Sequence, residues 1–450
     1  MALLVLIVPA IRYVFFQGYL KEGATFYNVF ISEKTDNKSS IYDGKEIHRN
    51  IYHYTAGFLG GMFGKENTAV FLPIILGILS ALTFYKILEK LKVNPNISML
   101  SSLILIVSPT YIYAFNASTP LSLIIFLSLL GVYLLIQDTP AITTLPVFFA
   151  LSLFGWASAA VASAVIVMHA IYKVKNFRRM WMLLLIILAG ATAGYFMKFD
   201  IVYQNQAGNN ILKGFISDFG GETGIGIFTL ILGLFGLIIS WRNKEKHYVL
   251  FIFLIALIIA SAINSFFITY LVFIFSILAA HAIFTIMRRE WEIETIKNLT
   301  VLIIFCGIIF STVSYYNNLL ISAPNNDMIG AMRFVNEKAN KAYTIFSSPE
   351  NGFIIEYYGG TVVMDTTLMG RDLQRINDTS TIYYSRNILV TKKLLDKYNV
   401  GYIILDKKMK DVTWTNDEQG LLFLLRKSED FRKIYNRESV EIWEYMGSRR

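Results

Sequence analysis

The sequence has little charge and almost no cysteine. Only 16% of its 450 residues are Asp, Glu, Lys or Arg, and 55% are hydrophobic. Soluble domains carry about 25% charged residues. This composition excludes an intrinsically disordered chain and argues against an ordinary soluble enzyme. The single cysteine, Cys306, excludes an internal disulfide and suggests no thiolate or zinc site.

Several signatures of nucleotide and metal chemistry are also missing. The chain has no Walker phosphate loop, no Gly-x-Gly-x-x-Gly before a helix, no His-Glu-x-x-His and no Cys/His cluster. These absences argue against an ATP-driven pump, a dehydrogenase and a zinc protease. The net charge of +9 lies largely in short loops between hydrophobic segments, so we expect no nucleic-acid partner.

Long hydrophobic runs dominate the first part of the chain. Residues 98–136 and 248–287 contain no charged side chain, and each run exceeds the roughly 20 residues that cross a bilayer. Residues 143–172 leave open one long helix or two short ones, and 248–286 should divide near Asn264. We predict eleven transmembrane helices, at 2–16, 68–85, 99–116, 119–136, 143–157, 158–172, 180–196, 224–240, 248–263, 266–286 and 299–317.

The loop charges predict an orientation. Basic residues gather in alternate short loops, such as 173–179 and 242–246, whereas the short loops near 117, 157 and 264 have none. Basic loops face the cytoplasm. We therefore expect a multi-pass protein of the cell membrane with a cytoplasmic N-terminus and an extracytoplasmic C-terminal domain. This alternation favours two helices within 143–172.

The end of the chain is charged throughout and shows α/β alternation. The expected fold is a polytopic α-helical membrane domain over 1–323, with a large outer loop at 17–67, and a soluble α/β domain over 324–450. In the soluble domain we predict helices at 328–340 and 391–398, and strands at 343–346, 353–358, 361–364 and 401–405, with a strand pair in 431–445.

The first loop contains three recognisable segments. They are 23–28 (Gly-Ala-Thr-Phe-Tyr-Asn), 41–45 (Ile-Tyr-Asp-Gly-Lys) and 52–56 (Tyr-His-Tyr-Thr-Ala). In order and position they resemble the Gly-Asp-Pro-Tyr-Tyr-His, Tyr-x-Gly-Arg and Tyr-x-Tyr-Pro-Pro segments of the GT-C superfamily of membrane glycosyltransferases. That group includes the oligosaccharyltransferase catalytic subunit and archaeal enzymes that use polyprenyl-phosphate sugars.

The sequence also departs from this family. The first-loop Asp of the family falls at about Ala24, and the acid that often follows the third span is absent from 116–120. The arginine of the late spans is replaced around Ser265, and the tail lacks a Trp-Trp-Asp-like acceptor motif.

The resemblance implies a need for an acid at the site. Such an acid acts as a general base, or binds a divalent cation such as Mg²⁺ or Mn²⁺ that offsets the charge of the leaving phosphate. Asp43 and Glu22 are the catalytic candidates in the outer loop, and the metal is left open. Asp43 could equally serve only to form its Asp-Gly turn.

Cations and aromatic residues of the outer face are candidates for substrate binding. Arg12, Lys21 and Arg49 could hold a lipid phosphate, although Arg12 could also extend to the interface like other long cations. The remaining candidates, for stacking on or hydrogen bonding to a sugar, are His48, His53 and Tyr54. Tyrosines in this region also fit an interfacial aromatic belt.

We therefore expect an enzyme that transfers a sugar from a polyprenyl-phosphate donor to a glycan, lipid or protein acceptor in the cell envelope. The alternative is a catalytically inactive relative that binds lipid-linked glycan or serves as an assembly subunit, because Ala24 replaces the usual acid. A third reading, a transporter, has less support, since transporters place ionisable residues at the bilayer midplane.

Overall fold

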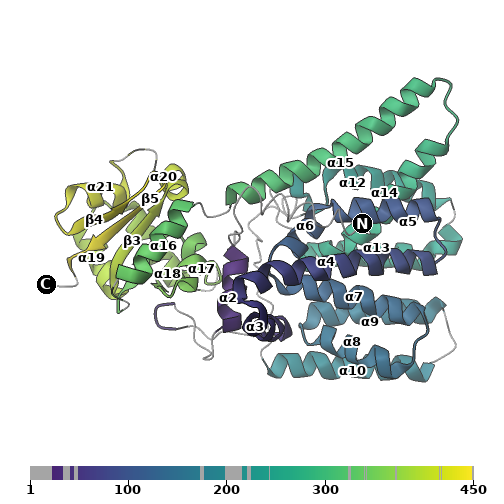
Figure 1. Ribbon diagram of the computed structural model, residues 1–450, viewed down its shortest axis with the longest axis horizontal. Coiled ribbons are helices and arrows are strands. Elements are labelled where there is room, and N and C mark those ends of the chain that lie inside the picture. The colour runs from purple at the N-terminus through teal and green to yellow at the C-terminus, as the bar shows by residue number, and fades with distance from the viewer. Residues whose placement is uncertain are drawn as a thin grey trace. The chain divides into compact units, whose positions relative to one another are not determined.

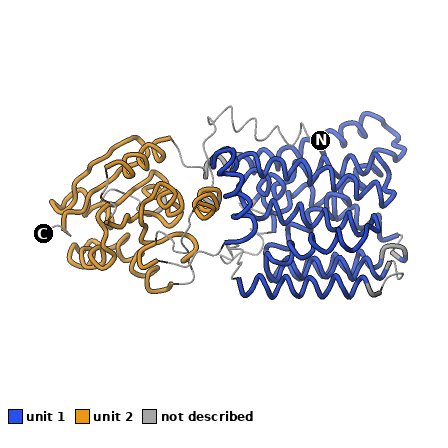
Figure 2. The backbone as a smooth tube through the Cα atoms, turned by 60° about the horizontal axis from the view of Figure 1, so that its bottom comes forward, with its two compact units in different colours: residues 1–20, 48–321 blue, residues 21–47, 322–450 orange. Residues whose placement is uncertain are grey.

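The computed structural model forms two compact units (Figure 2). The first unit comprises the described residues between 48 and 321, and the second those between 21 and 47 and those after 321. The structure describes residues 23–33, 41–44, 49–172, 177–197, 215–219, 224–242, 244–322, 326–338, 340, 342–369, 372–414, 416 and 418–447.

The first unit is a bundle of apolar helices. Helix α4 packs on α7, α7 on α8 and α9, and α8 and α9 on α10, so these helices run side by side (Figure 1). The helices are α3 (Ile51–Phe63), α4 (Lys65–Lys90), α5 (Pro95–Ile106), α6 (Pro109–Asn116), α7 (Pro120–Ile136), α8 (Ala141–Ser152), α9 (Trp156–Tyr172), α10 (Phe177–Phe196), α12 (Ile227–Trp241), α13 (Lys244–Ile263), α14 (Phe266–Arg288) and α15 (Glu294–Ser322), with the 3-10 turn η2 (Ser217–Phe219).

Each predicted span coincides with one or two of these helices, apart from 2–16, which lies outside the described residues. By length and composition, α4, α10, α14 and α15 can each cross a membrane, and the bent pair α5–α6 makes a fifth candidate. The remaining apolar helical stretches, such as Tyr248–Ile263 of α13, have 10–17 residues. The number of spans, eleven, therefore stays a prediction.

Breaks between helices have local causes. Gly155 adopts a left-handed φ of 108° between α8 and α9, so 143–172 forms two helices. The 248–286 run divides at Asn264 as predicted, with the Asn264 side chain accepting the N–H of Phe266. Span 99–116, predicted as one helix, bends by 62° where Ser108 and Pro109 begin α6, because proline lacks an N–H for the preceding turn.

Close helix contacts depend on glycine. A Cβ atom at Gly194 of α10 would lie 2.6 Å from the Leu153 carbonyl oxygen, and one at Gly236 of α12 would lie 2.0 Å from that of Leu278. Small residues let helix backbones approach in this way where no hydrophobic effect drives association.

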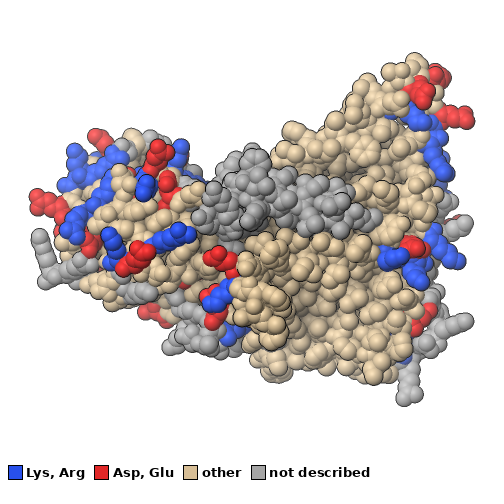
Figure 3. All heavy atoms as spheres, in the orientation of Figure 1, with Lys and Arg blue, Asp and Glu red and all other residues tan. Residues whose placement is uncertain are grey.

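On the face drawn in Figure 3, the described side chains along the flanks of the helices of the first unit are uncharged, and charge gathers at helix ends.

The second unit contains a mixed sheet with strand order β2-β1-β3-β5-β4. Strands β1, β2 and β3 pair in parallel, while β5 is antiparallel to β3 and β4. Its elements are α2 (Gly23–Glu33), α16 (Asn326–Lys338), β1 (Thr344–Phe346), the 3-10 turn η3 (Pro349–Asn351), α17 (Gly352–Tyr357), β2 (Thr361–Val362), α18 (Leu373–Tyr384), α19 (Ile388–Lys397), β3 (Val400–Asp406), α20 (Lys407–Thr413), α21 (Gly420–Lys427), β4 (Phe431–Asn436) and β5 (Val440–Tyr445).

One predicted strand is wrong. Residues 353–358 have strand-like side chains but form helix α17, because Pro349 starts a 3-10 turn that runs directly into it. Packing overrides the local preference, since Phe353, Ile354 and Ile355 are all buried. Gly359, with φ of 83°, ends the helix, so this glycine turn joins a helix to β2 rather than two strands.

Part of the first loop belongs to the second unit, although the sequence had assigned 17–67 to the membrane domain as a whole. Helix α2 packs on α17, with the rings of Phe26 and Tyr357 5.3 Å apart and those of Tyr27 and Phe353 4.6 Å apart. Ile41 forms a parallel bridge to Val362 of β2. These contacts explain why residues 21–47 group with the C-terminal unit.

Candidate functional site

The candidate residues fall into three groups. Arg12, Lys21, Glu22 and His48 lie outside the described residues. Arg49, His53 and Tyr54 belong to the first unit, and Asp43 belongs to the second.

His53 is built into the start of α3. The Asn50 side chain accepts the N–H groups of Tyr52 (3.0 Å) and His53 (3.4 Å), and the Asn50 N–H donates to His53 Nδ1 (3.0 Å). This is a capping box, with histidine in the place usually taken by Glu or Gln. Because Nδ1 accepts a hydrogen bond, the proton of the neutral ring sits on Nε2.

The environment keeps His53 neutral. Its side chain is buried, and desolvation together with the positive charge of Arg49 lowers the pKa of His53 to about 3. At neutral pH the imidazole is therefore an uncharged group that does not carry a proton to a substrate. The sequence identified both Arg49 and His53, but not this coupling between them.

Tyr52 links α3 to the 116–120 loop. Its hydroxyl lies 2.8 Å from Ser118 Oγ, and the ring is fully buried. Burial raises the pKa of Tyr52, so the pair remains neutral. Residues 50–53 and 118 thus form a polar cluster of the first unit. Sequence reasoning missed Ser118, because serine is common in these spans.

Tyr54 lies on the opposite side of α3. Tyr54 is 56% exposed, and Phe58 and Met62, on the same side of the helix, are also exposed. Tyr52 and Ala56 are buried. This exposed apolar stripe agrees with the interfacial reading of the tyrosine. A sugar contact by Tyr54 remains a proposal.

Asp43 occupies a tight turn. The Gly44 N–H donates to the Ile41 carbonyl oxygen at 2.9 Å, and Asp43 has a left-handed φ of 66°. The Asp-Gly turn expected from the sequence is therefore present. The Asp43 side chain is 71% exposed and points its carboxylate within 3.8 Å of Arg375 Nη2. The acid is both accessible and partnered by a cation.

Other acids have structural duties. Asp218 accepts the N–H of Ile227 at 2.8 Å and so caps the start of α12. Among the residues that the structure describes, no three His, Cys, Asp or Glu side chains lie close enough to hold a metal ion. The described residues therefore hold no ready-made set of three such ligands for the Mg²⁺ or Mn²⁺ that the resemblance implies.

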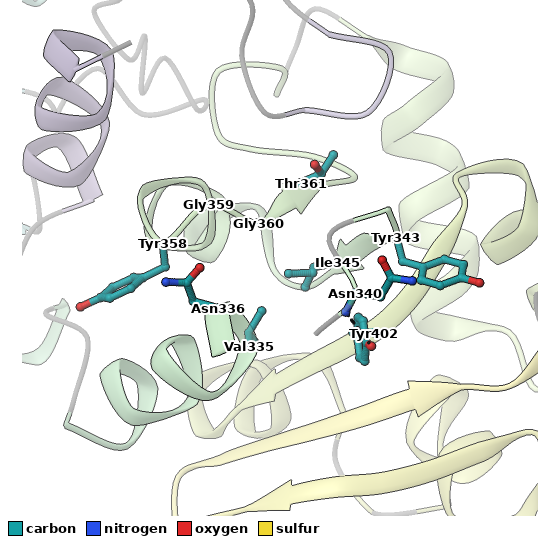
Figure 4. A pocket seen from close by; sticks show the side chains of 10 residues that line it. All are labelled: Val335, Asn336, Asn340, Tyr343, Ile345, Tyr358, Gly359, Gly360, Thr361 and Tyr402. Carbon is teal, nitrogen blue, oxygen red and sulfur yellow. Dashed lines mark hydrogen bonds between the residues drawn. The ribbon is translucent and has the colours of Figure 1, made fainter. Parts of the chain in front are cut away.

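A small pocket lies in the second unit (Figure 4). It has a volume of about 270 Å³, including its open mouth, and Tyr343, Tyr358 and Tyr402 line it together with Asn336. The Tyr402 hydroxyl accepts the N–H of Asn340 at 3.1 Å. The described residues of its lining include no carboxylate, histidine, lysine or arginine.

Comparison with known proteins identifies the fold. No family model and no curated protein sequence matches the chain. Among solved structures, it is similar to the apo form of the oligosaccharyltransferase of Archaeoglobus fulgidus, with a TM-score of 0.58, 13% identity and coverage of 90% of this chain and 69% of that one. Most of both chains is therefore matched.

Two further structures of the A. fulgidus protein agree. One, a complex with an inhibitory peptide and a dolichol-phosphate, has a TM-score of 0.55 at 12% identity, covering 87% of this chain and 66% of that one. The other, with zinc and sulfate, has a TM-score of 0.57 at 13% identity, covering 98% and 73%. The chain has the fold of the GT-C membrane glycosyltransferases, and the resemblance seen in its sequence is confirmed at the level of the fold.

Proposed function

We propose that this protein is a membrane glycosyltransferase that moves a sugar from a polyprenyl-phosphate donor to an acceptor on the outer face of the cell membrane. The observation that carries the proposal is the likeness to an oligosaccharyltransferase over 90% of the chain. One structure of that relative holds a dolichol-phosphate, which is a donor carrier of the proposed chemical class. The proposal includes the cytoplasmic N-terminus and the outer C-terminal domain expected from the loop charges.

The proposed reaction is a direct displacement. Asp43 accepts the proton of an acceptor hydroxyl or amide while that group's heteroatom forms a bond to the anomeric carbon. The bond from the anomeric carbon to the phosphate oxygen breaks, and the electron pair leaves with the polyprenyl phosphate. Arg49, Arg12 and Lys21 offset its negative charge. Glu22 is the alternative base.

The remaining candidates have positioning duties in this proposal. His53, as a neutral group, holds the start of α3 in place beside the sugar, and His48 and Tyr54 contact the sugar. No step is assigned to a metal ion, because the described side chains do not assemble a ligand set.

The test is a transfer assay with purified protein in liposomes. Undecaprenyl and dolichyl phosphates carrying radiolabelled glucose or mannose serve as donors, and a membrane lipid extract and sequon peptides as acceptors. The double variant Asp43→Asn, Glu22→Gln should lose about 100-fold or more in kcat, the size of a general-base effect. Asp411→Asn, which changes another acid of the second unit, serves as the matched control. Wild-type transfer by the double variant would refute the mechanism.

A second candidate, an inactive lipid-glycan binder or assembly subunit, has its own supporting observation. Ala24 of α2 stands where the family has its acid, and the described residues contain no cluster of metal ligands. This function predicts binding of radiolabelled undecaprenyl phosphate without transfer from any donor tested. Transfer by the purified wild type would eliminate it.

A further inference from the structure

The turn that carries Asp43 is attached to an edge of the sheet in the second unit. Strand β2 is the outermost strand, and Ile41 pairs with its Val362 in parallel. The Tyr42 N–H donates to the Val362 carbonyl oxygen at 2.9 Å. Ile41 is 4% exposed, so the pairing also buries an apolar side chain. A loop distant in sequence thus extends the sheet by a short strand-like segment.

Arg375 of α18 contacts this turn through its side chain. Its Nη1 donates to the carbonyl oxygens of Tyr42 (3.1 Å) and Val363 (3.0 Å), which belong to the loop and to the chain just after β2. Its Nη2 lies 3.8 Å from Asp43 Oδ2. One guanidinium therefore contacts the turn at a main-chain oxygen and at the carboxylate, and also contacts the sheet.

The arginine itself is held in place. Asp372 caps α18 by accepting the Arg375 N–H at 2.9 Å, and its second oxygen lies 3.2 Å from Arg375 Nε. The guanidinium carbon lies 5.7 Å from the centre of the Tyr398 ring, which also meets the Tyr42 ring edge to face at 5.5 Å. The Arg375 side chain is only 11% exposed. Such a planar fork, already oriented, loses little entropy for each hydrogen bond that it makes.

The separate contacts have unequal strength. In the ion pair between Arg375 and Asp43 the carboxylate is exposed to solvent, and exposed ion pairs contribute little to stability on their own. The two hydrogen bonds to carbonyl oxygens are charge-assisted and largely buried, which makes them the stronger part. Arg375 therefore acts mainly on the position of the turn's backbone and secondarily on the Asp43 carboxylate.

We propose that Arg375 is a positioning residue for the transfer reaction, holding the 41–44 turn on the sheet edge so that the Asp43 carboxylate keeps one fixed place. This inference rests on the proposed role of Asp43 as base. A base that moves by about 1 Å loses much of its effect, since proton transfer needs hydrogen-bond distance in the reacting geometry. Loss of Arg375 should thus lower kcat and leave the KM for the lipid donor unchanged.

The experiment joins hydrogen–deuterium exchange with transfer kinetics on the full-length protein. The variants are Arg375→Gln, Arg375→Lys, Asp372→Asn and Asp43→Asn, and Arg386→Gln is the matched control. Arg386 is an exposed arginine of the same unit that lies over the Phe423 ring at 4.4 Å. Exchange is followed in peptides that contain the Tyr42 amide, and kinetics use whichever radiolabelled polyprenyl-phosphate sugar the wild type transfers.

Arg375→Gln should speed exchange at Tyr42 at least tenfold and lower kcat at least tenfold. Arg375→Lys should bring both the exchange rate at Tyr42 and kcat part of the way back to their wild-type values. One ammonium retains the charge but cannot reach two carbonyl oxygens and Asp372 together. Asp372→Asn keeps the helix cap and removes only the charge beside Nε, so it should have a smaller effect in the same direction. This milder variant also covers the case in which Arg375→Gln does not fold.

Different results overturn different claims. Wild-type exchange at Tyr42 in the Arg375→Gln protein would show that Arg375 does not hold the turn; if that variant does not fold, wild-type exchange in both the Arg375→Lys and Asp372→Asn proteins shows the same. Faster exchange with kcat equal to that of Arg386→Gln would show that the turn is held but that its position is unimportant. Wild-type kcat in Asp43→Asn would remove the proposed base, and with it the positioning role, independently of the exchange data.

Discussion

The buried histidine of α3 makes the stability of the protein depend on pH in a defined window. Folding lowers the pKa of His53 from 6.5 to about 3, so below pH 6.5 the unfolded chain takes up a proton that the folded chain does not. The contribution of His53 to the free energy of unfolding is therefore fully present above about pH 6.5, and it falls as the pH drops toward 3. The slope is about 1.4 kcal/mol per pH unit. Moving from pH 7 to pH 5 should cost about 2 kcal/mol.

The variant His53→Gln isolates this effect. Gln at the third helical position is the usual partner in a capping box, and its side-chain oxygen can accept the Asn50 N–H without ever becoming charged. At pH 8 the variant should unfold at nearly the wild-type temperature. At pH 5 it should be the more stable protein by about 2 kcal/mol, a difference of several degrees in Tm.

Thermal unfolding in detergent micelles, followed by tryptophan fluorescence between pH 8 and pH 5, measures the difference. Other groups that titrate in this range are common to both proteins, so they cancel when the two midpoints are subtracted at each pH. The difference between the two midpoints, variant minus wild type, should be constant above pH 6.5 and should increase as the pH falls below it. Parallel curves across the whole range would show that the pKa of His53 is not lowered by folding, and the reasoning from burial would be wrong.

Two further predictions concern packing in the first unit. Gly194→Ala places a Cβ atom 2.6 Å from the Leu153 carbonyl oxygen and should cost about 1–3 kcal/mol, whereas Gly61→Ala, which meets no described atom within 4 Å, should be neutral or stabilise by up to about 1 kcal/mol. Equal midpoints for the two alanine variants in thermal unfolding would contradict the close α8–α10 contact. Thr110→Val removes the hydroxyl that donates to the Gly224 carbonyl oxygen (2.8 Å) and accepts its N–H (3.0 Å), so it should cost about 2 kcal/mol in the same assay. A midpoint equal to that of the wild type would show that these two bonds do not form.

The positions of the apolar helices could be read from the sequence because hydropathy is a local property. A run such as 266–286 has no charged residue, and it forms α14 within two residues of the predicted ends. The division of 143–172 was also accessible, since the alternation of basic loops favoured it and Gly155 is the residue that permits the turn. The bend at Pro109 was missed because the apolar run continues across it.

The candidate site was less accessible. Asp43 was identified from its motif, but nothing local indicated that the neighbouring Tyr42 carbonyl oxygen accepts a hydrogen bond from Arg375, which lies 333 positions after Tyr42. His53 was identified as an outer-face histidine, whereas its burial and its lowered pKa depend on how α3 packs. The helix at Gly352–Tyr357 was read as a strand because its burial outweighs its side-chain preference.

The sequence by itself determined an apolar helical part and a charged α/β part, because composition and periodicity act over windows of about 20 residues. Its resemblance to one class of transferases came from three short segments of the first loop. Only the tertiary structure decided that α2 and the turn of Asp43, which belong to the first loop, group with the C-terminal unit. That outcome depends on a sheet edge completed by Ile41, on rings of α2 packed against α17, and on one arginine that reaches two backbone segments. These contacts join residues hundreds of positions apart, and no local pattern in a single sequence records which distant groups will meet.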